Sequence, residues 1–112
     1  RIVARLQPQV FGEPLSPENA GALTQMMQAV VDSGTGTAAQ ISGISVAGKT
    51  GTAQNPGGDP HAWFVAFAPA EQPTVAVAVV VLNGGDLGSE ATGGAVAAPI
   101  ARTVMEEALT SP

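Results

Sequence analysis

Lys49 is the only lysine in the 112-residue sequence, and its neighbours are small or carry hydroxyl groups. It lies in the stretch Val46-Ala-Gly-Lys-Thr-Gly-Thr-Ala-Gln54. A lysine that serves solubility is normally one of many, whereas this one is solitary. The glycines beside it leave room for a close approach to the backbone. Lys49 would give a fixed positive charge, and the Thr50 and Thr52 hydroxyls could donate to a carboxylate or pass on a proton.

The same residues match a phosphate-binding loop pattern, G-x-x-x-x-G-K-[ST], from Gly43 to Thr50. That loop requires a strand before its first glycine and a helix that begins at the lysine, because the N–H groups of the helix hold the phosphates. Here the order is reversed, since Ile44 and Val46 are β-branched strand formers and residues 56–58 are Pro-Gly-Gly. No helix can begin there, so we do not expect a nucleotide-binding site.

Ser45 to Ala53 has Val46 followed by alternating small and polar residues, which is typical of a strand with one packed face and one polar face. On a sheet edge, free N–H and C=O groups could pair with an extended peptide, and Gly51 removes the side chain that would block it. The alternative is an ordinary surface lysine in a strand whose threonines serve β propensity. The residues alone leave both interpretations open.

A helix is predicted before this stretch, from about Pro17 to Ser33, with Ser16 as its N-cap and Gly34 as the residue after its end. Its apolar stripe is expected to pack in the core, including the methionine pair. The stripe consists of Leu23, Met26, Met27, Val30 and Val31. Residues 34–37 are expected to be a flexible connection.

Three strands and a second helix are predicted in the rest of the chain. A short strand is expected at Arg1–Leu6, and two strands that are apolar on both faces are expected around Trp63–Ala68 and at Thr74–Leu82. Short loops favour antiparallel hairpins. A helix should run from about Ala95 to Leu109, with Pro99 tolerated near its start. Together with the lysine strand, these elements predict an α+β fold with an antiparallel sheet and no internal domain boundary.

Composition excludes several classes of partner and site. A net charge of −5 with only four Lys and Arg residues argues against nucleic acid. Without cysteine and with a single histidine, no disulfide framework, zinc site or other cofactor is expected. The longest apolar run, Val75–Leu82, is far shorter than the roughly 20 residues that span a bilayer. The remaining titratable loop residues are expected to be solvated and without a catalytic role: Asp59, His61, Asp86 and Glu90.

One resemblance decides between the two interpretations of the lysine strand. Lys49-Thr-Gly-Thr-Ala-Gln54, followed by His61-Ala-Trp-Phe-Val-Ala-Phe-Ala-Pro69, resembles the third-motif region of class B penicillin-binding proteins, the D,D-transpeptidases that cross-link peptidoglycan. The order of helices and strands is similar over nearly the whole chain. The Ala- and Val-rich composition is similar to that of high-GC actinobacterial members. The three residues Lys-Thr-Gly alone are weak evidence for this family, whereas six matching residues followed by a correctly spaced Trp-Phe strand are specific evidence for it.

The resemblance implies a five-stranded antiparallel sheet with helices on both sides, in a serine β-lactamase-like fold. This chain would supply the last three strands and the final helix. Lys49 would set the positive field, assist proton transfer and attract the substrate carboxylate. Thr50 and Thr52 would hydrogen-bond that carboxylate, Gly51 would lie in the substrate site, and the Thr52 N–H would be one of two oxyanion-hole donors.

The sequence departs from the family pattern in two motifs. The family mechanism needs a Ser-x-x-Lys pair and a Ser-x-Asn motif, and neither occurs in the 112 residues. This segment alone therefore cannot form the acyl-enzyme. Residues 1–112 are expected to be the C-terminal part of a transpeptidase domain whose nucleophile lies elsewhere. Any targeting segment is expected to have been removed or never included.

The resemblance also implies partners and a location. The partners would be peptidoglycan stem peptides ending in D-Ala-D-Ala, β-lactam antibiotics, the remainder of the same domain, and proteins of cell-wall synthesis or division. The location would be the extracytoplasmic face of the bacterial membrane, with an N-terminal anchor absent here. Two alternatives remain open: a D,D-carboxypeptidase or serine β-lactamase, and a non-catalytic sensor or binding module with the same fold.

Overall fold

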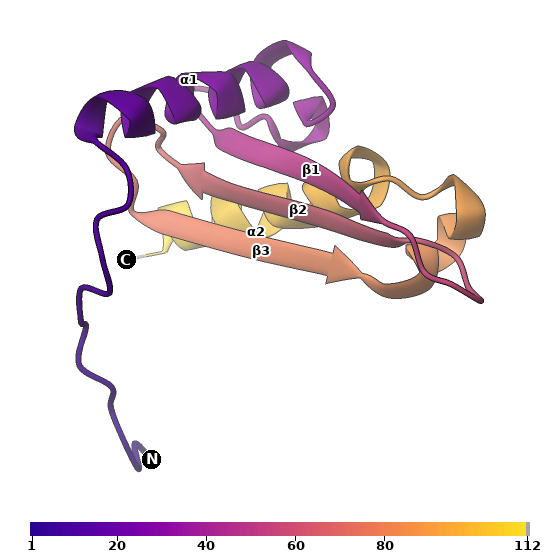
Figure 1. Ribbon diagram of the computed structural model, residues 1–112, viewed down its shortest axis with the longest axis horizontal. Helices are drawn as coiled ribbons and strands as arrows, with labels where there is room; N and C mark the ends of the chain where they lie inside the picture. Colours follow the sequence, from indigo (N-terminus) through magenta and orange to yellow (C-terminus); the bar gives the residue numbers. More distant parts are fainter. Residues whose placement is uncertain (112) are drawn as a thin grey trace.

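The computed structural model describes residues 1–111, and in them a three-stranded antiparallel sheet packs against two helices (Figure 1). The strands are β1 (Ala47–Ala53), β2 (His61–Ala68) and β3 (Val75–Val81), in the spatial order β1-β2-β3. The observed strands agree with the predicted ones to within two residues at the ends that were predicted. The α+β class and the antiparallel hairpins are confirmed.

Helix α1 (Pro17–Ser33) has the predicted bounds because its two ends carry local signals. The Ser16 hydroxyl accepts a hydrogen bond from the Asn19 N–H at 3.2 Å, which caps the first turn. At the other end, the Gly34 N–H donates to the Val30 carbonyl at 3.1 Å. A Cβ atom on Gly34 would lie 2.9 Å from the Val30 backbone, so this position requires glycine for reasons of space.

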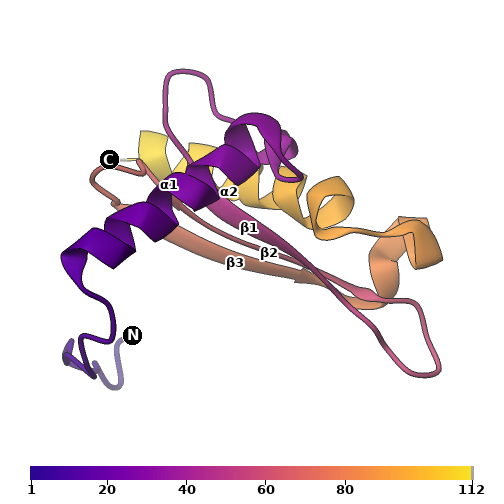
Figure 2. The same cartoon turned by 45° about the horizontal axis from the view of Figure 1, so that its top comes forward.

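The prediction that the whole apolar stripe of α1 packs in the core is wrong for this chain. Among its residues only Val31 is fully buried, whereas Leu23 and Met26 are 43% and 61% exposed. Figure 2 shows the reason: α1 follows the β1 side of the sheet, and its first turns extend past the ends of the strands. Only the last turn of α1 therefore reaches the core.

Helix α2 (Ala98–Thr110) begins three residues later than predicted, because Gly93–Ala97 form a π-helical turn. The Thr92 hydroxyl caps this turn by accepting a hydrogen bond from the Ala95 N–H at 3.2 Å. Pro99 lies in the first turn of α2, directly after the π-helical turn. Pro99 therefore does not interrupt the helix, as predicted.

The core lies between one face of β2 and the two helices. Its largest fully buried side chains are Phe64, Met105, Val31 and Val46. A Cβ atom on Gly48 would lie 2.6 Å from the Phe64 ring, so the absence of a side chain at this position of β1 lets that ring pack directly against the strand. Burying a phenylalanine contributes about 1.5–3 kcal/mol, which makes this contact a main support of β1.

Two expectations about the strands are not met. Residues 1–6 form no strand, because a strand needs a neighbour for its backbone hydrogen bonds and this segment is fully exposed. β2 lies between β1 and β3, but the second of its two apolar faces is open, with Trp63 42% exposed and Val65 41% exposed. β3 lies at the other edge of the described sheet.

Candidate active site

Strand β1 carries all the predicted site residues and forms one edge of the sheet. It pairs with β2 on one side, and among residues 1–111 no strand lies on its other side. Side chains alternate along a strand, so Lys49 and Gly51 share the open face of the sheet. Thr50 and Thr52 share the opposite face, which the helices cover in part.

The backbone polar groups of Thr50 and Thr52 face the free edge. Gly93 packs where β1 meets β2: a Cβ atom on it would lie 2.8 Å from both the nitrogen and the oxygen of Gly51 and would overlap the Trp63 carbonyl oxygen. The polar groups of Gly51 therefore point toward β2. Because this direction alternates in an antiparallel pair, those of the residues on either side of Gly51 point outward.

Lys49 brings its ammonium group to the same free edge. Its side chain is exposed, and Nζ donates to the Thr50 carbonyl at 2.6 Å. The only salt bridge within residues 1–111 joins Arg102 and Glu106, at 2.9 Å between nitrogen and oxygen. The charge of Lys49 is thus available to an anion that approaches β1.

Thr50 is held by a residue that sequence reasoning missed. Its hydroxyl oxygen lies 2.7 Å from the hydroxyl oxygen of Thr35, fifteen residues earlier. The expectation that residues 34–37 are flexible is wrong: Gly36 is buried, its N–H donates to the Val30 carbonyl at 2.9 Å, and a Cβ atom on it would lie 3.2 Å from Phe64. The glycines on both sides of Thr35 were the available signal, because they permit this close packing.

His61 supports the hairpin at the far end of β1. Its Nδ1 accepts a hydrogen bond from the Asn83 N–H at 3.0 Å. The Asn83 side-chain oxygen in turn accepts one from Asn55 Nδ2 at 2.8 Å. These bonds tie the β1–β2 loop to the short turns over Leu82–Glu90, so His61 has a structural contact in a region where no catalytic role was predicted.

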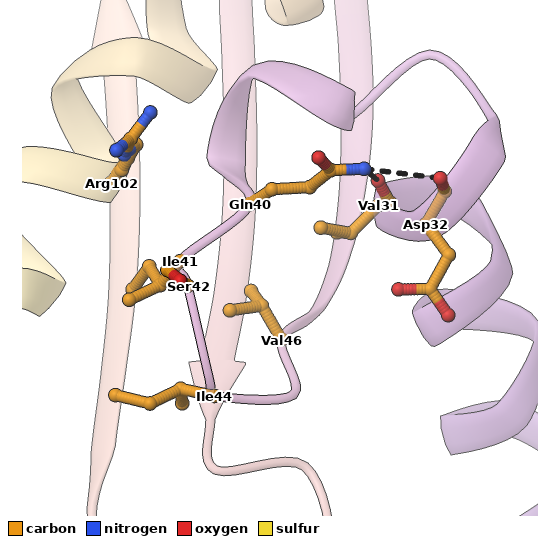
Figure 3. A pocket seen from close by; sticks show the side chains of 8 residues that line it. All are labelled: Val31, Asp32, Gln40, Ile41, Ser42, Ile44, Val46 and Arg102. Atoms are coloured by element: carbon orange, nitrogen blue, oxygen red, sulfur yellow. Dashed lines mark hydrogen bonds between the residues drawn. The ribbon is translucent and has the colours of Figure 1, made fainter.

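A cavity at the start of β1 does not coincide with these residues (Figure 3). It has a volume of about 460 Å³ and lies at the opposite end of β1 from Thr52. Its lining residues are Val31, Asp32, Gln40, Ile41, Ser42, Ile44, Val46 and Arg102. The Gln40 amide crosses it to donate to the carbonyls of Val31 and Asp32, both at 3.0 Å, and so caps the end of α1. This cavity is part of the scaffold.

Metal sites and membrane-spanning helices are absent from the described part of the chain. No three His, Asp or Glu side chains in residues 1–111 gather closely enough to hold a metal ion. None of the helices in that range is both long and apolar enough to cross a bilayer. The candidate site is the free edge of β1, which carries Lys49, Thr50, Gly51 and Thr52.

The chain belongs to a known family. Residues 2–106 match the penicillin binding protein transpeptidase domain, so the chain is a member of that family. The expected fold and the expected resemblance to penicillin-binding protein transpeptidases, including actinobacterial ones, are thereby confirmed.

Two relatives show to which members of the family the chain is similar. The chain is 46% identical over 112 residues to the peptidoglycan D,D-transpeptidase PbpA of Mycolicibacterium smegmatis, which covers 96% of this chain and 22% of the relative. It is 51% identical over 100 residues to PbpA of Mycobacterium tuberculosis, which covers 85% of this chain and 20% of the relative. The chain thus spans about a fifth of the length of these relatives.

A solved structure agrees with the sequence comparison. Penicillin-binding protein A from M. tuberculosis, in its ceftriaxone acyl-enzyme complex, superposes with a TM-score of 0.77 and 47% identity, covering 86% of this chain and 22% of that one. The transpeptidase domain of FtsI4 from Legionella pneumophila superposes with a TM-score of 0.74 and 36% identity, covering 86% of this chain and 37% of that one.

Proposed function

We propose that this chain is the C-terminal part of the transpeptidase domain of a peptidoglycan D,D-transpeptidase that β-lactams inhibit. The observation that carries the proposal is the single lysine beside the free edge of β1, in a member of the transpeptidase family. The relatives named peptidoglycan D,D-transpeptidase and the relative seen as a ceftriaxone acyl-enzyme support it.

The free edge of β1 suits an extended peptide that ends in a carboxylate. Such a peptide adds to the edge as a further strand, and Gly51 has no side chain to block its approach. The Lys49 ammonium attracts the carboxylate, and the Thr50 and Thr52 hydroxyls hydrogen-bond to it. The Thr52 N–H, which faces the free edge, is then one of the donors to the carbonyl oxygen that becomes negative in the transition state.

The nucleophile of the proposed reaction lies outside these residues. A serine hydroxyl attacks the carbonyl carbon of the penultimate D-Ala, and the C–N bond to the terminal D-Ala breaks. The proton from the serine passes to the leaving amine, with Lys49 assisting through its charge. The amine of a second stem peptide then attacks the carbonyl carbon of the acyl-serine, the C–O bond to serine breaks, and a proton of the amine passes to the serine oxygen, which forms the cross-link and releases the serine.

The proposed location and partners follow the same assignment. The protein would act at the extracytoplasmic face of the bacterial membrane, held by an N-terminal segment outside these residues. Its partners would be stem peptides, β-lactams, the rest of its own domain, and proteins of cell-wall synthesis or division. The open face with Trp63 and Val65 supports the need for the rest of the domain, since large bare apolar patches are rare on isolated domains.

Labelling the complete protein with a fluorescent penicillin tests the proposal. We expect one covalent adduct on a serine outside these residues, found by peptide mass spectrometry. A protein that carries no adduct would instead be a sensor or binding module. A D-Ala-D-Ala peptide offered with a D-amino acid acceptor then separates the enzymes: exchange indicates a transpeptidase, hydrolysis alone a carboxypeptidase, and rapid turnover of penicillin a β-lactamase.

A further inference from the structure

The hydrogen bond between Thr35 and Thr50 leaves two possible directions for the hydroxyl proton of Thr50. The two hydroxyl oxygens lie 2.7 Å apart, so one of them donates to the other. Each hydroxyl has a single proton but can accept more than one hydrogen bond. If Thr50 donates to Thr35, its proton is unavailable to a ligand. If Thr35 donates to Thr50, the Thr50 proton is free.

We propose that Thr35 is a positioning residue that donates to the Thr50 oxygen and directs the Thr50 proton toward the carboxylate of a ligand on β1. This inference rests on the proposed function. A carboxylate accepts hydrogen bonds but cannot donate them, so its arrival selects the direction from Thr35 through Thr50 to the anion. Each bond in such a chain polarises the next, which strengthens the final one.

Lys49 places a positive charge beside this chain. Its Nζ donates to the carbonyl of Thr50 at 2.6 Å, so the ammonium group lies next to the residue whose hydroxyl Thr35 holds. A carboxylate at the free edge can therefore meet the ammonium group and the directed hydroxyl proton together. Neither Asp nor Glu pairs with Lys49 within residues 1–111, so no internal carboxylate competes there.

The backbone of Thr35 is wedged in place by neighbours on both sides. A Cβ atom on Gly94, in the π-helical turn before α2, would overlap the Thr35 carbonyl oxygen and would lie 3.7 Å from the Thr50 methyl group. On its other side, the buried Gly36 donates to the Val30 carbonyl at 2.9 Å. Thr35 therefore cannot turn away without displacing the π-helical turn or the end of α1.

The same turn also supports the next residue of β1. Gly93 packs over the Gly51–Trp63 pair, and a Cβ atom on it would overlap the Trp63 carbonyl oxygen. The Gly93-Gly94 pair thus lets one turn contact the Thr35 backbone and β1 at once. This arrangement makes Thr35 part of the support of the site rather than of a mobile loop.

The test compares Thr35→Val, which keeps the shape but loses the hydroxyl, with Thr35→Ser, which keeps the hydroxyl. In the complete protein, the second-order rate constant of acylation is measured by intact-protein mass spectrometry for a penicillin with its free carboxylate and for its methyl ester. Thr37→Val is the matched control, because Thr37 is an exposed threonine in the same segment.

We expect Thr35→Val to slow acylation by the carboxylate form about fivefold to tenfold, which is the scale of one hydrogen bond between uncharged groups. Acylation by the methyl ester should be unchanged, and Thr35→Ser should restore most of the loss. An equal loss with both compounds, or no loss with either, overturns the positioning role. If the unaltered protein is acylated by neither compound, the proposed function fails and this inference fails with it.

Discussion

Strands β1 and β3 both form edges of the sheet, but their residues differ in polarity and charge. From Lys49 to Thr52, β1 contains a charge, two hydroxyls and a glycine. β3 is built only of valine and alanine, and its residues alternate between half-buried and exposed. A polar edge strand whose backbone is accessible suits a ligand that binds reversibly. An uncharged apolar edge strand is prone to aggregation unless another segment of protein covers it permanently. We therefore expect β1 to bind substrate and β3 to pair with another part of the protein.

Lys49→Ala should give the largest effect, and on activity alone. Acylation of the complete protein by penicillin should fall about 10²–10³-fold, the scale seen when one preorganised electrostatic contact is lost at an acyl-transfer site. The midpoint of thermal unfolding should stay close to that of the unaltered protein, because the side chain is exposed. Arg5→Ala is the matched control, since it removes one exposed positive charge away from β1. Unchanged acylation in Lys49→Ala would mean that Lys49 does not contribute to the reaction and that β1 is not the substrate-binding edge.

Val79→Asp should show that β3 is scaffold. The side chain is half-buried on the helix-covered face, so an aspartate there leaves a poorly solvated charge and should cost about 3 kcal/mol of unfolding free energy. Val79→Ala, which removes volume without adding charge, should cost about 1 kcal/mol. Urea unfolding of the complete protein measures both. Equal costs for the two variants would mean that the charge is solvated and that β3 is more open than the structure indicates.

Two glycines of β1 allow a position that supports the fold to be distinguished from a position that faces the ligand, within the same strand. Gly48→Ala would put a Cβ atom 2.6 Å from the Phe64 ring, so we expect a loss of about 1–3 kcal/mol in stability. Gly51→Ala meets only the Trp63 side chain, at 3.4 Å, and should fold normally. It should instead slow acylation by a peptide thioester, since the methyl group faces the approaching ligand. The reverse pattern would place the ligand elsewhere.

The smallest effect concerns the contact that ties the start of β1 to the loop before β3. The Ser45 hydroxyl donates to the Glu71 carboxylate and lowers the pKa of Glu71 from its ordinary value of 4.5. A lowered folded-state pKa stabilises the protein above the unfolded-state value, and this stabilisation is lost as the pH falls through the folded-state pKa.

Ser45→Ala should therefore lower the midpoint of thermal unfolding more at pH 7 than at a pH well below 4.5, where Glu71 is protonated in the folded state as well. A remainder independent of pH is expected, because the Ser45 oxygen also accepts the Ala70 N–H at 3.1 Å. Glu71→Gln should remove only the pH-dependent part. A difference that stays constant between the two pH values would exclude this ionised contact.

Local signals in the sequence predicted the elements well. The Ser16-Pro17 start and the Gly34 end place α1 to the residue, because capping depends on neighbours in the chain. The strands follow from alternation and from the turn residues between them. The predicted site residues do lie together on one free edge, since all four belong to a single strand.

The sequence could not predict features that depend on distant contacts. The expected strand at residues 1–6 has no neighbour to pair with, and the burial of the α1 stripe depends on what packs against it. The contact between Thr35 and Thr50 joins two segments separated by fifteen residues. α2 starts late because a π-helical turn precedes it, and Gly93 of that turn lies close against β1, which is a tertiary contact.

The Gly93-Gly94 pair also gives a way to sort sequences. As a residue pattern, the stretch from Gly43 to Thr50 cannot be distinguished from a nucleotide-binding loop. A search of sequences with that pattern therefore returns nucleotide-binding proteins and proteins like this one together. A strand that must be supported by a close backbone contact needs side-chain-free positions in the partner segment, whereas a phosphate loop does not. Requiring a later glycine pair together with an earlier Gly-Thr-Gly should therefore reject nucleotide-binding false positives and retain chains built like this one.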